Sequence, residues 1–237
     1  MATYLILSRI SPQAFDELNS VSATLALFHE DVLHDFNAGL NDLTEQAFRR
    51  SIGLNPTPPR IHWMHARMLL YIGEPHEAEL EMRQVLATNP DQFKALAYLG
   101  EFLYYQGKLD EAEPIVDRAV QLARDSGDDV PQLLAAFGYA SRKEPGKIDR
   151  RVFQYRPERF IDGDGACWIG GIYALLGDRE HALIWLKRAA ALGYVNYPWF
   201  ERDKNYDSLR ADPEYQTIMS GLRQRWEAYK EEFGTAR

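Results

Sequence analysis

The stretch YYQGKLDEAEPIVDRAV, residues 104–120, decides the fold of this protein. Gly107 ends the helix expected before it, because glycine adopts the left-handed backbone of a helix C-terminus at little cost. A second helix follows at once, since apolar residues then recur three and four positions apart and form one stripe. The residues of this stripe are Leu109, Ala112, Ile115, Val116 and Ala119. The stretch therefore predicts two helices joined by a tight turn.

The same layout recurs along the chain at a nearly fixed period. Gly39, Gly73 and Gly107 are 34 residues apart. Gly177 follows Gly107 by 70 residues, which is one period of 34 and one of 36. Helix-turn-helix units that repeat at this spacing stack so that each unit contacts its neighbours, and they bury one continuous core. The period therefore predicts an all-α solenoid.

This pattern resembles the tetratricopeptide repeat, which places a Leu-Gly pair, an aromatic residue, Ala, a large apolar residue and Pro at set positions. The third unit fits the pattern best, through Leu96, Leu99, Gly100, Leu103, Gly107, Ala112, Val116 and Ala119. The resemblance implies an array of about five units. A small residue at positions 66, 100 and 170 is expected to let the two helices of a unit approach closely.

The resemblance divides the chain into an array with a cap at each end. The units are placed at about 25–58, 59–92, 93–126, 127–162 and 163–196, and the fourth is degenerate. Residues 1–24 are expected to form an N-terminal capping helix, and residues 197–237 a loop and a C-terminal capping helix. Such caps cover the open ends of a solenoid, which solubility requires.

Composition narrows the class of partner. Of the 237 residues, 46% are apolar and 26% are charged, so one continuous core fits a single domain. The net charge of -8 argues against a general nucleic-acid or anionic-membrane binder, because both need a field of the opposite sign. The single cysteine excludes an internal disulfide. With no signal peptide or membrane span in the sequence, we expect a cytoplasmic protein.

The resemblance also locates a binding surface. In this family the first helix of each unit lines a concave groove, and its groove positions in the second and third units hold aromatic and charged residues. These residues are Arg60, Trp63, Arg67, Tyr71, Lys94, Glu101, Tyr104 and Tyr105. Trp, Tyr and Arg anchor many protein interfaces. We expect a non-catalytic scaffold or adaptor whose groove binds a peptide with acidic and apolar residues, although each aromatic residue can instead pack against a neighbouring helix.

The irregular fourth unit offers a second surface. Residues 141–160 carry seven Lys or Arg residues against three acidic ones. The arginines of interest are Arg150, Arg151, Arg156 and Arg159. A run of charge is usually a solvated face. In an acidic chain, however, a basic segment is also suited to an acidic partner.

The sequence gives less support for catalysis or metal binding than for a binding groove. The sequence has no Gly-rich nucleotide loop and no kinase signature, so we predict no catalytic residue and no cofactor. His62 and His65 are three positions apart, and His76 lies on the next predicted helix. This spacing leaves a small metal site open as an alternative. Packing of the two histidines between helices is the favoured interpretation, because no second ligand cluster is visible.

The C-terminal third has a narrower resemblance. Residues 168–218, which begin WIGGIYALLGDREHALIWL, are similar to the ends of tetratricopeptide arrays in bacterial signalling proteins. There such arrays accompany a serine/threonine kinase, an adenylyl cyclase or a winged-helix regulator. This implies an alternative function as the sensory or regulatory module of such a protein. The sequence leaves open whether the chain stands alone or is a C-terminal piece, and the ends of an isolated array allow a homodimer.

Overall fold

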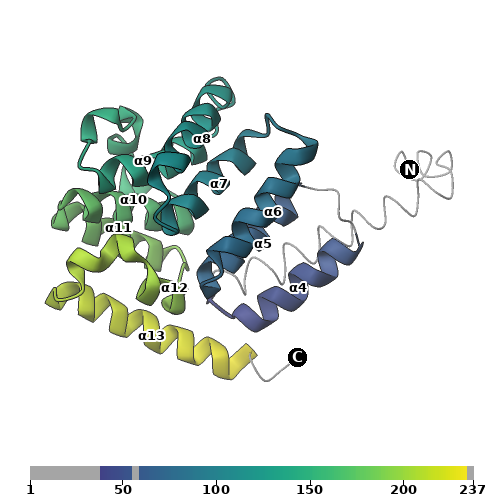
Figure 1. Cartoon of the computed structure of the whole chain (residues 1–237). Coiled ribbons are helices and arrows are strands. Elements are labelled where there is room, and N and C mark those ends of the chain that lie inside the picture. Colours follow the sequence, from purple (N-terminus) through teal and green to yellow (C-terminus); the bar gives the residue numbers. More distant parts are fainter. Residues whose placement is uncertain (1–37, 55–58, 234–237) are drawn as a thin grey trace, which may run out of the picture.

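The computed structural model describes residues 38–54 and 59–233, and every regular element in these ranges is a helix (Figure 1). The α-helices are α4 (Asn41–Leu54), α5 (Pro59–Ile72), α6 (Pro75–Thr88), α7 (Phe93–Tyr105), α8 (Leu109–Leu122), α9 (Val130–Ser141), α10 (Gly163–Leu176), α11 (Arg179–Ala191), α12 (Tyr197–Arg202) and α13 (Pro213–Phe233). The 3₁₀ helices are η2 (Pro145–Lys147), η3 (Arg150–Phe153), η4 (Pro157–Arg159) and η5 (Lys204–Leu209). The all-α class predicted from the repeat is confirmed. The expected N-terminal capping helix lies outside the described residues.

Helices pack in pairs, and the pairs stack. α5 packs against α6, α7 against α8 and α10 against α11. Tight turns join the two helices of each pair, and Gly107 and Gly177 have φ angles of 79° and 84° in these turns. A residue with a side chain adopts this left-handed conformation only at a cost, which is why glycine recurs there. The first helices of the pairs, α5, α7 and α10, form one row together with α9.

The helices of a pair approach closely where the sequence has a small residue. A Cβ added to Gly100 would lie 2.1 Å from Cγ1 of Val116 on the paired helix. A Cβ added to Gly170 would lie 2.6 Å from the hydroxyl oxygen of Tyr206. Ala66 is fully buried. These positions confirm that small side chains bring neighbouring elements together in this fold.

The fourth unit departs from the helix pair, as its degenerate sequence predicts. α9 is followed by three 3₁₀ turns, η2 to η4, instead of a second α-helix. Ile148 and Val152 are buried in these turns and replace part of the missing helix face. Phe160, which follows η4, packs edge-on against Trp185 of α11 with 5.3 Å between ring centroids. The exact unit boundaries stay a prediction.

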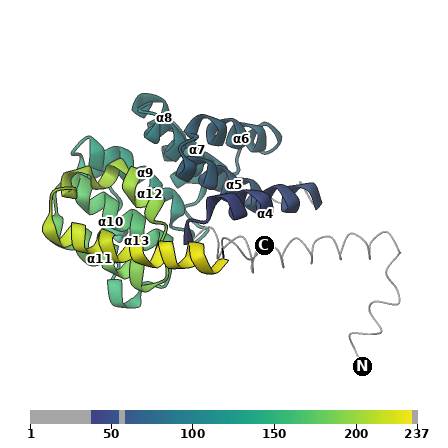
Figure 2. The same ribbon diagram turned by 90° about the horizontal axis from the view of Figure 1, so that it is seen from below.

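After α11 the chain turns back into the array. Residues 194–209, which we call the inner segment, contain α12 and η5 and pack against α5 and α10. α13 then lies along α11 and α12, with its C-terminal end next to the start of α4 (Figure 2). The indole nitrogen of Trp226 on α13 donates a hydrogen bond of 3.3 Å to the carbonyl oxygen of Gly39. The two ends of the described chain therefore meet.

Candidate partner-binding groove

The inner segment fills the concave face formed by the first helices. The Tyr71 ring of α5 stacks on Trp199 of α12 with 4.5 Å between centroids. The Tyr105 ring of α7 meets the same tryptophan edge-on at 5.1 Å. Tyr71 is only 1% exposed as a result. The aromatic residues of this part of the groove thus contact the protein's own C-terminal region.

Hydrogen bonds fix the inner segment against α7. The Tyr104 hydroxyl donates to Oδ1 of Asn205 at 2.6 Å, and Nδ2 of Asn205 donates to the Tyr105 hydroxyl at 2.9 Å. The Tyr105 hydroxyl in turn donates to Asp203 at 3.0 Å. The ammonium of Lys204 donates to the carbonyl oxygen of Tyr104 at 2.7 Å. Because these buried polar groups satisfy one another, a peptide could enter here only by displacing the segment.

Arg67 belongs to this closed region. Its side chain is 3% exposed, forms an ion pair with Asp164 of α10 and hydrogen-bonds Tyr71. The guanidinium also lies over the rings of Tyr98 and Trp168, 5.5 and 4.8 Å from their centroids. Burial disfavours its charged form, but the Asp164 carboxylate outweighs this effect and raises the pKa of Arg67. The guanidinium is therefore a structural cation that joins α5 to α10.

Glu101 of α7 lies in the same region without a partner. Its side chain has no solvent exposure, and neither carboxyl oxygen has a hydrogen-bond partner in the described part of the chain. Burial raises the pKa of Glu101 to about 8, with Arg67 lowering it and Asp164 and Asp203 raising it further. Glu101 is therefore mainly protonated at neutral pH in the folded protein. It supplies no negative charge to a partner.

The remaining part of the groove, nearer the start of α7, is built from aromatic rings and one ion pair. The Trp63 ring of α5 lies 6.2 Å from Tyr98, which in turn lies 6.5 Å from Trp168 of α10. The ammonium of Lys94 lies 5.2 Å from the Trp63 centroid and 2.6 Å from a carboxylate oxygen of Asp128. We call Trp63, Lys94, Tyr98, Asp128 and Trp168 the groove mouth. It connects α5, α7, α10 and the loop before α9.

An open hollow of about 370 Å³ adjoins the groove mouth. It is lined by Ser126, Gly127, Asp128, Asp129, Val130, Leu133, Tyr155, Phe160, Asp162, Gly165 and Trp168. Its volume falls within the range of ligand pockets, about 300–1,000 Å³. The carboxylates at its edge have partners: Asp129 lies 3.3 Å from Arg151, and Asp162 accepts a 3.1 Å hydrogen bond from the backbone of Asp164. The lining therefore combines aromatic and aliphatic side chains with polar groups.

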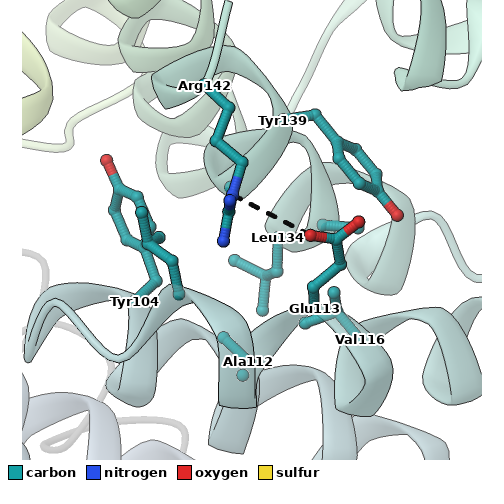
Figure 3. Close-up of a pocket in the computed structure, with 11 residues that line it drawn as sticks. Tyr104, Ala112, Glu113, Val116, Leu134, Tyr139 and Arg142 are labelled. Carbon is teal, nitrogen blue, oxygen red and sulfur yellow. Dashed lines mark ion pairs between the residues drawn. The ribbon is translucent and has the colours of Figure 1, made fainter. Parts of the chain in front are cut away.

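A second crevice, between α7, α8 and α9, is too small for a ligand. Figure 3 shows Tyr104, Leu134 and Val116 around it, with Arg142 and Glu113 forming an ion pair of 3.8 Å across its opening. Its volume is about 10 Å³. That is at most the space of a single water molecule. The crevice is a packing gap between two units.

The structure separates the eight predicted groove residues into two sets. Arg67, Tyr71, Glu101 and Tyr104 are buried and contact the protein itself, whereas Arg60, Trp63, Lys94 and Tyr105 keep some exposure. Arg67 and Lys94 each pair with a carboxylate of this chain, so their charges are already engaged. Partner binding through the exposed set stays a prediction. One signal for the closure is present in the sequence: YVNYPWF, residues 194–200, is too aromatic for a solvent-exposed loop.

The four arginines of the second predicted surface also differ in whether they form ion pairs. Arg151 pairs with Asp149 at 2.9 Å and with Asp129 at 3.3 Å, so its charge is engaged. Arg150, Arg156 and Arg159 are exposed, and within the described ranges no carboxylate pairs with them. Three of the four arginines therefore remain available to an external anion.

The histidines of α5 contact carboxylates of other helices. Nδ1 of His62 lies 2.9 Å from Glu81, and Nδ1 of His65 lies 2.7 Å from the other oxygen of the same group. Nε2 of His65 lies 2.9 Å from Glu45 of α4. His76, the third residue of the metal-site alternative, is largely exposed on α6. Among the described residues, no group of three ligands is arranged to hold a metal ion.

A comparison with known protein families agrees with the helix pairs. Residues 69–137, from the end of α5 into α9, match the family described as tetratricopeptide repeat. A solved structure titled "MamA MSR-1 C2" is similar to the chain with a TM-score of 0.40 and 15% sequence identity, over 72% of this chain and 96% of that one. No curated protein matches the sequence. No helix in the described ranges has the length and apolar composition to cross a bilayer. Residues 69–137 thus match a tetratricopeptide repeat, and the stacked helix pairs have the helix-turn-helix layout of such repeats.

Proposed function

We propose that this chain is a non-catalytic scaffold that binds a segment of a partner protein at the groove mouth, with an apolar side chain of that segment seated in the hollow. Tetratricopeptide repeats are in general protein-interaction scaffolds, with an extended concave binding surface. The observation that carries the proposal is the position of the hollow. It shares Asp128 and Trp168 with the groove mouth, and none of its described lining residues belongs to the inner segment.

One part of the hollow's lining suits an apolar anchor. Tyr155, Phe160 and Trp168 supply rings, and Val130 and Leu133 supply aliphatic surface. Burial of apolar surface contributes about 25 cal/mol per Å², so one large buried side chain contributes about 1.5–3 kcal/mol to binding. Asp128 and Asp129 of the lining already pair with Lys94 and Arg151, so neither carboxylate favours a cationic anchor.

Three finer expectations accompany this proposal. The resemblance of residues 168–218 to arrays of signalling proteins supports a regulatory role, in which the scaffold docks a partner while another protein or domain acts. A cytoplasmic location and a homodimer stay predictions. Both are compatible with a groove mouth that binds a peptide segment.

Panning a random peptide library on the purified full chain tests the proposal. Two variants change the site: Trp63→Ala removes one wall of the groove mouth, and Val130→Phe fills the hollow. Ile184→Ala is the matched control, because Ile184 is a partly exposed apolar residue on α11. We expect the selected peptides to share an apolar residue. They should bind the control as tightly as the wild type and the two site variants about tenfold more weakly, a change of about 1.4 kcal/mol. Peptides that bind all four proteins equally would contradict the proposal.

A further inference from the structure

The geometry points to an acidic partner segment: we infer that Arg156 and Arg159, at the edge of the hollow, bind carboxylates that flank the apolar anchor. This inference rests on the proposed function and adds the charge of the partner to it. The partner segment would then contain acidic and apolar residues, as the sequence predicts. The cations that select the peptide, however, lie outside the row of groove helices.

The two arginines lie at the two ends of a short turn. They flank η4, and the backbone N–H of Arg159 donates a 3.0 Å hydrogen bond to the carbonyl oxygen of Arg156. Arg156 is the extended residue directly before η4 and Arg159 is the last residue of η4, so a single turn separates them. Both side chains are exposed, and neither forms an ion pair within the part of the chain that the structure describes. They thus form a two-arginine site with unused hydrogen-bond donors.

The turn that carries the arginines also forms a wall of the hollow. Tyr155 precedes Arg156 and Phe160 follows Arg159, and both aromatic residues line the hollow. Their rings meet edge-on with 5.3 Å between centroids. A segment anchored in the hollow would therefore pass beside the arginine pair. Arginine suits this contact because its planar fork of donors matches a carboxylate.

The turn is held rigidly although its surface is exposed. Arg188 of α11 donates two hydrogen bonds, of 3.0 and 2.5 Å, to the carbonyl oxygen of Phe160. The Phe160 ring packs edge-on against the buried Trp185. Because the backbone is already fixed, binding orders only the two arginine side chains. A smaller loss of entropy leaves more of the interaction free energy for affinity.

Arg156 and Arg159 differ from the other cations of residues 141–160 in the pairing of their charges. Other cations of residues 141–160 are engaged: Lys147 and Arg142 pair with carboxylates of α8, and Arg151 pairs with Asp149. The chain as a whole carries a net charge of -8, which repels a long polyanion. A short acidic segment that meets only the local pair avoids most of this repulsion. Ile161, which is 87% exposed two residues after Arg159, adds aliphatic surface for such a segment.

Fluorescence anisotropy with two labelled peptides tests the inference. The first peptide has about 12 residues with glutamates on both sides of a central leucine, and the second has glutamines in place of the glutamates. Arg156→Gln/Arg159→Gln removes the pair. Arg50→Gln/Arg124→Gln is the matched control, because it removes the same charge from exposed arginines that have no ion pair in the described ranges.

We expect wild type and the control variant to bind the glutamate peptide at least about tenfold more tightly than the glutamine peptide. Arg156→Gln/Arg159→Gln should lose this difference while keeping its weak affinity for the glutamine peptide. Trp63→Ala should weaken both peptides, which separates the hollow from the arginine pair. If Trp63→Ala alone weakens binding, the proposed function stands and the inference about charge fails.

Three other results would overturn the inference. Equal losses in both double variants would show a diffuse effect of net charge. Equally tight binding of a short single-stranded DNA would show a general anion site and not a peptide site. Loss of a wild-type dimer in Arg156→Gln/Arg159→Gln, measured by sedimentation velocity, would assign the pair to contacts between two copies of the chain. In contrast, an unchanged monomer in all variants supports binding of a separate partner.

Discussion

Tyr71 of α5 and Trp199 of α12 stack with 4.5 Å between ring centroids, although they come from the second repeat and the C-terminal region of the chain. This contact places the inner segment where a tetratricopeptide array is expected to receive a peptide. The protein therefore supplies the occupant of half its groove from its own sequence. A partner is left with the groove mouth and the hollow beside it.

The first prediction concerns Trp199. Trp199→Ala removes a buried ring that contacts both Tyr71 and Tyr105, and we expect the free energy of unfolding to fall by about 3–5 kcal/mol. Urea denaturation followed by circular dichroism measures this change. Phe153→Ala is the control, because Phe153 is partly exposed and its loss should cost much less. Equal midpoints for the two variants would mean that the inner segment contributes little to stability.

The second prediction concerns the ion pair of Arg67. Arg67→Ala leaves the Asp164 carboxylate without its main partner in a buried site, and we expect a loss of about 3–5 kcal/mol. Arg67→Met/Asp164→Leu removes both charges and should recover much of that stability, because no unpaired charge remains. Chemical denaturation of both variants measures these changes in the free energy of unfolding. A double variant no more stable than Arg67→Ala would argue against a desolvated pair.

The third prediction concerns the close approach of α7 and α8. Gly100→Ala brings a methyl group against Val116, and the resulting strain should cost about 1–3 kcal/mol. Adding Val116→Ala should relieve part of the strain, so the two changes are expected to be non-additive. Gly138→Ala is the control: it lies inside α9 with no atom within 4 Å of the added Cβ, and should stabilise by about 0.5–1 kcal/mol. Thermal unfolding of the four variants tests this, and additive effects would contradict it.

The fourth prediction is a pH dependence that arises from Glu101. Its pKa is raised to about 8 in the folded protein, so folded Glu101 keeps a proton that the unfolded chain loses at lower pH. Its contribution to stability is full below the unfolded-state pKa and is lost as pH rises through about 8. The slope in this window is at most about 1.4 kcal/mol per pH unit. Glu101→Gln should flatten the pH profile of urea midpoints between acidic and mildly alkaline buffer. An unchanged profile would place the titrating group elsewhere.

The fifth prediction concerns His65 and Glu81. Burial lowers the pKa of His65, but the carboxylates of Glu81 and Glu45 outweigh this and raise it. Burial alone would raise the pKa of Glu81, and its bonds to His62 and His65 lower it. The histidine contribution is lost as pH rises through the folded-state pKa of His65, and the glutamate contribution is lost as pH falls through that of Glu81. Stability from this pair should therefore be greatest in mildly acidic buffer.

Glu81→Gln tests the fifth prediction. It should destabilise the protein more in mildly acidic than in alkaline buffer, and it should lower the His65 pKa measured by NMR titration. Glu77→Gln, at an exposed position of the same helix, is the control and should leave both quantities unchanged. A His65 pKa that does not respond to Glu81→Gln would remove the basis of this prediction.

Local patterns in the sequence were sufficient to predict the helices and turns of the repeats. The apolar spacing after Gly107 predicts α8, the left-handed glycine predicts the turn before it, and Gly100 predicts the close approach to Val116. These features depend on residues near one another in the chain, or on one repeat packing against the next. Steric rules and helical periodicity describe such short-range relations well.

The groove could not be assigned in the same way. Tyr71 and Tyr104 occupy family groove positions, and the same residue types serve equally well to bind a partner or to pack inside a protein. The family groove positions predict that Arg67 contacts a partner, whereas its guanidinium pairs with Asp164 of α10. No periodic pattern indicates that the inner segment returns to α5 and α7, because its contacts join residues about a hundred positions apart.

The sequence by itself thus determined the all-α repeat, the turns between helices and the degenerate fourth unit, since these follow from local conformational preference and spacing. Only the tertiary structure decided which groove residues remain exposed. It also placed the hollow next to the η4 turn, whose arginines form no ion pair within the described residues. The physical reason is that burial and charge pairing depend on which distant segments meet, and the inner segment and η4 reach their places by long-range packing.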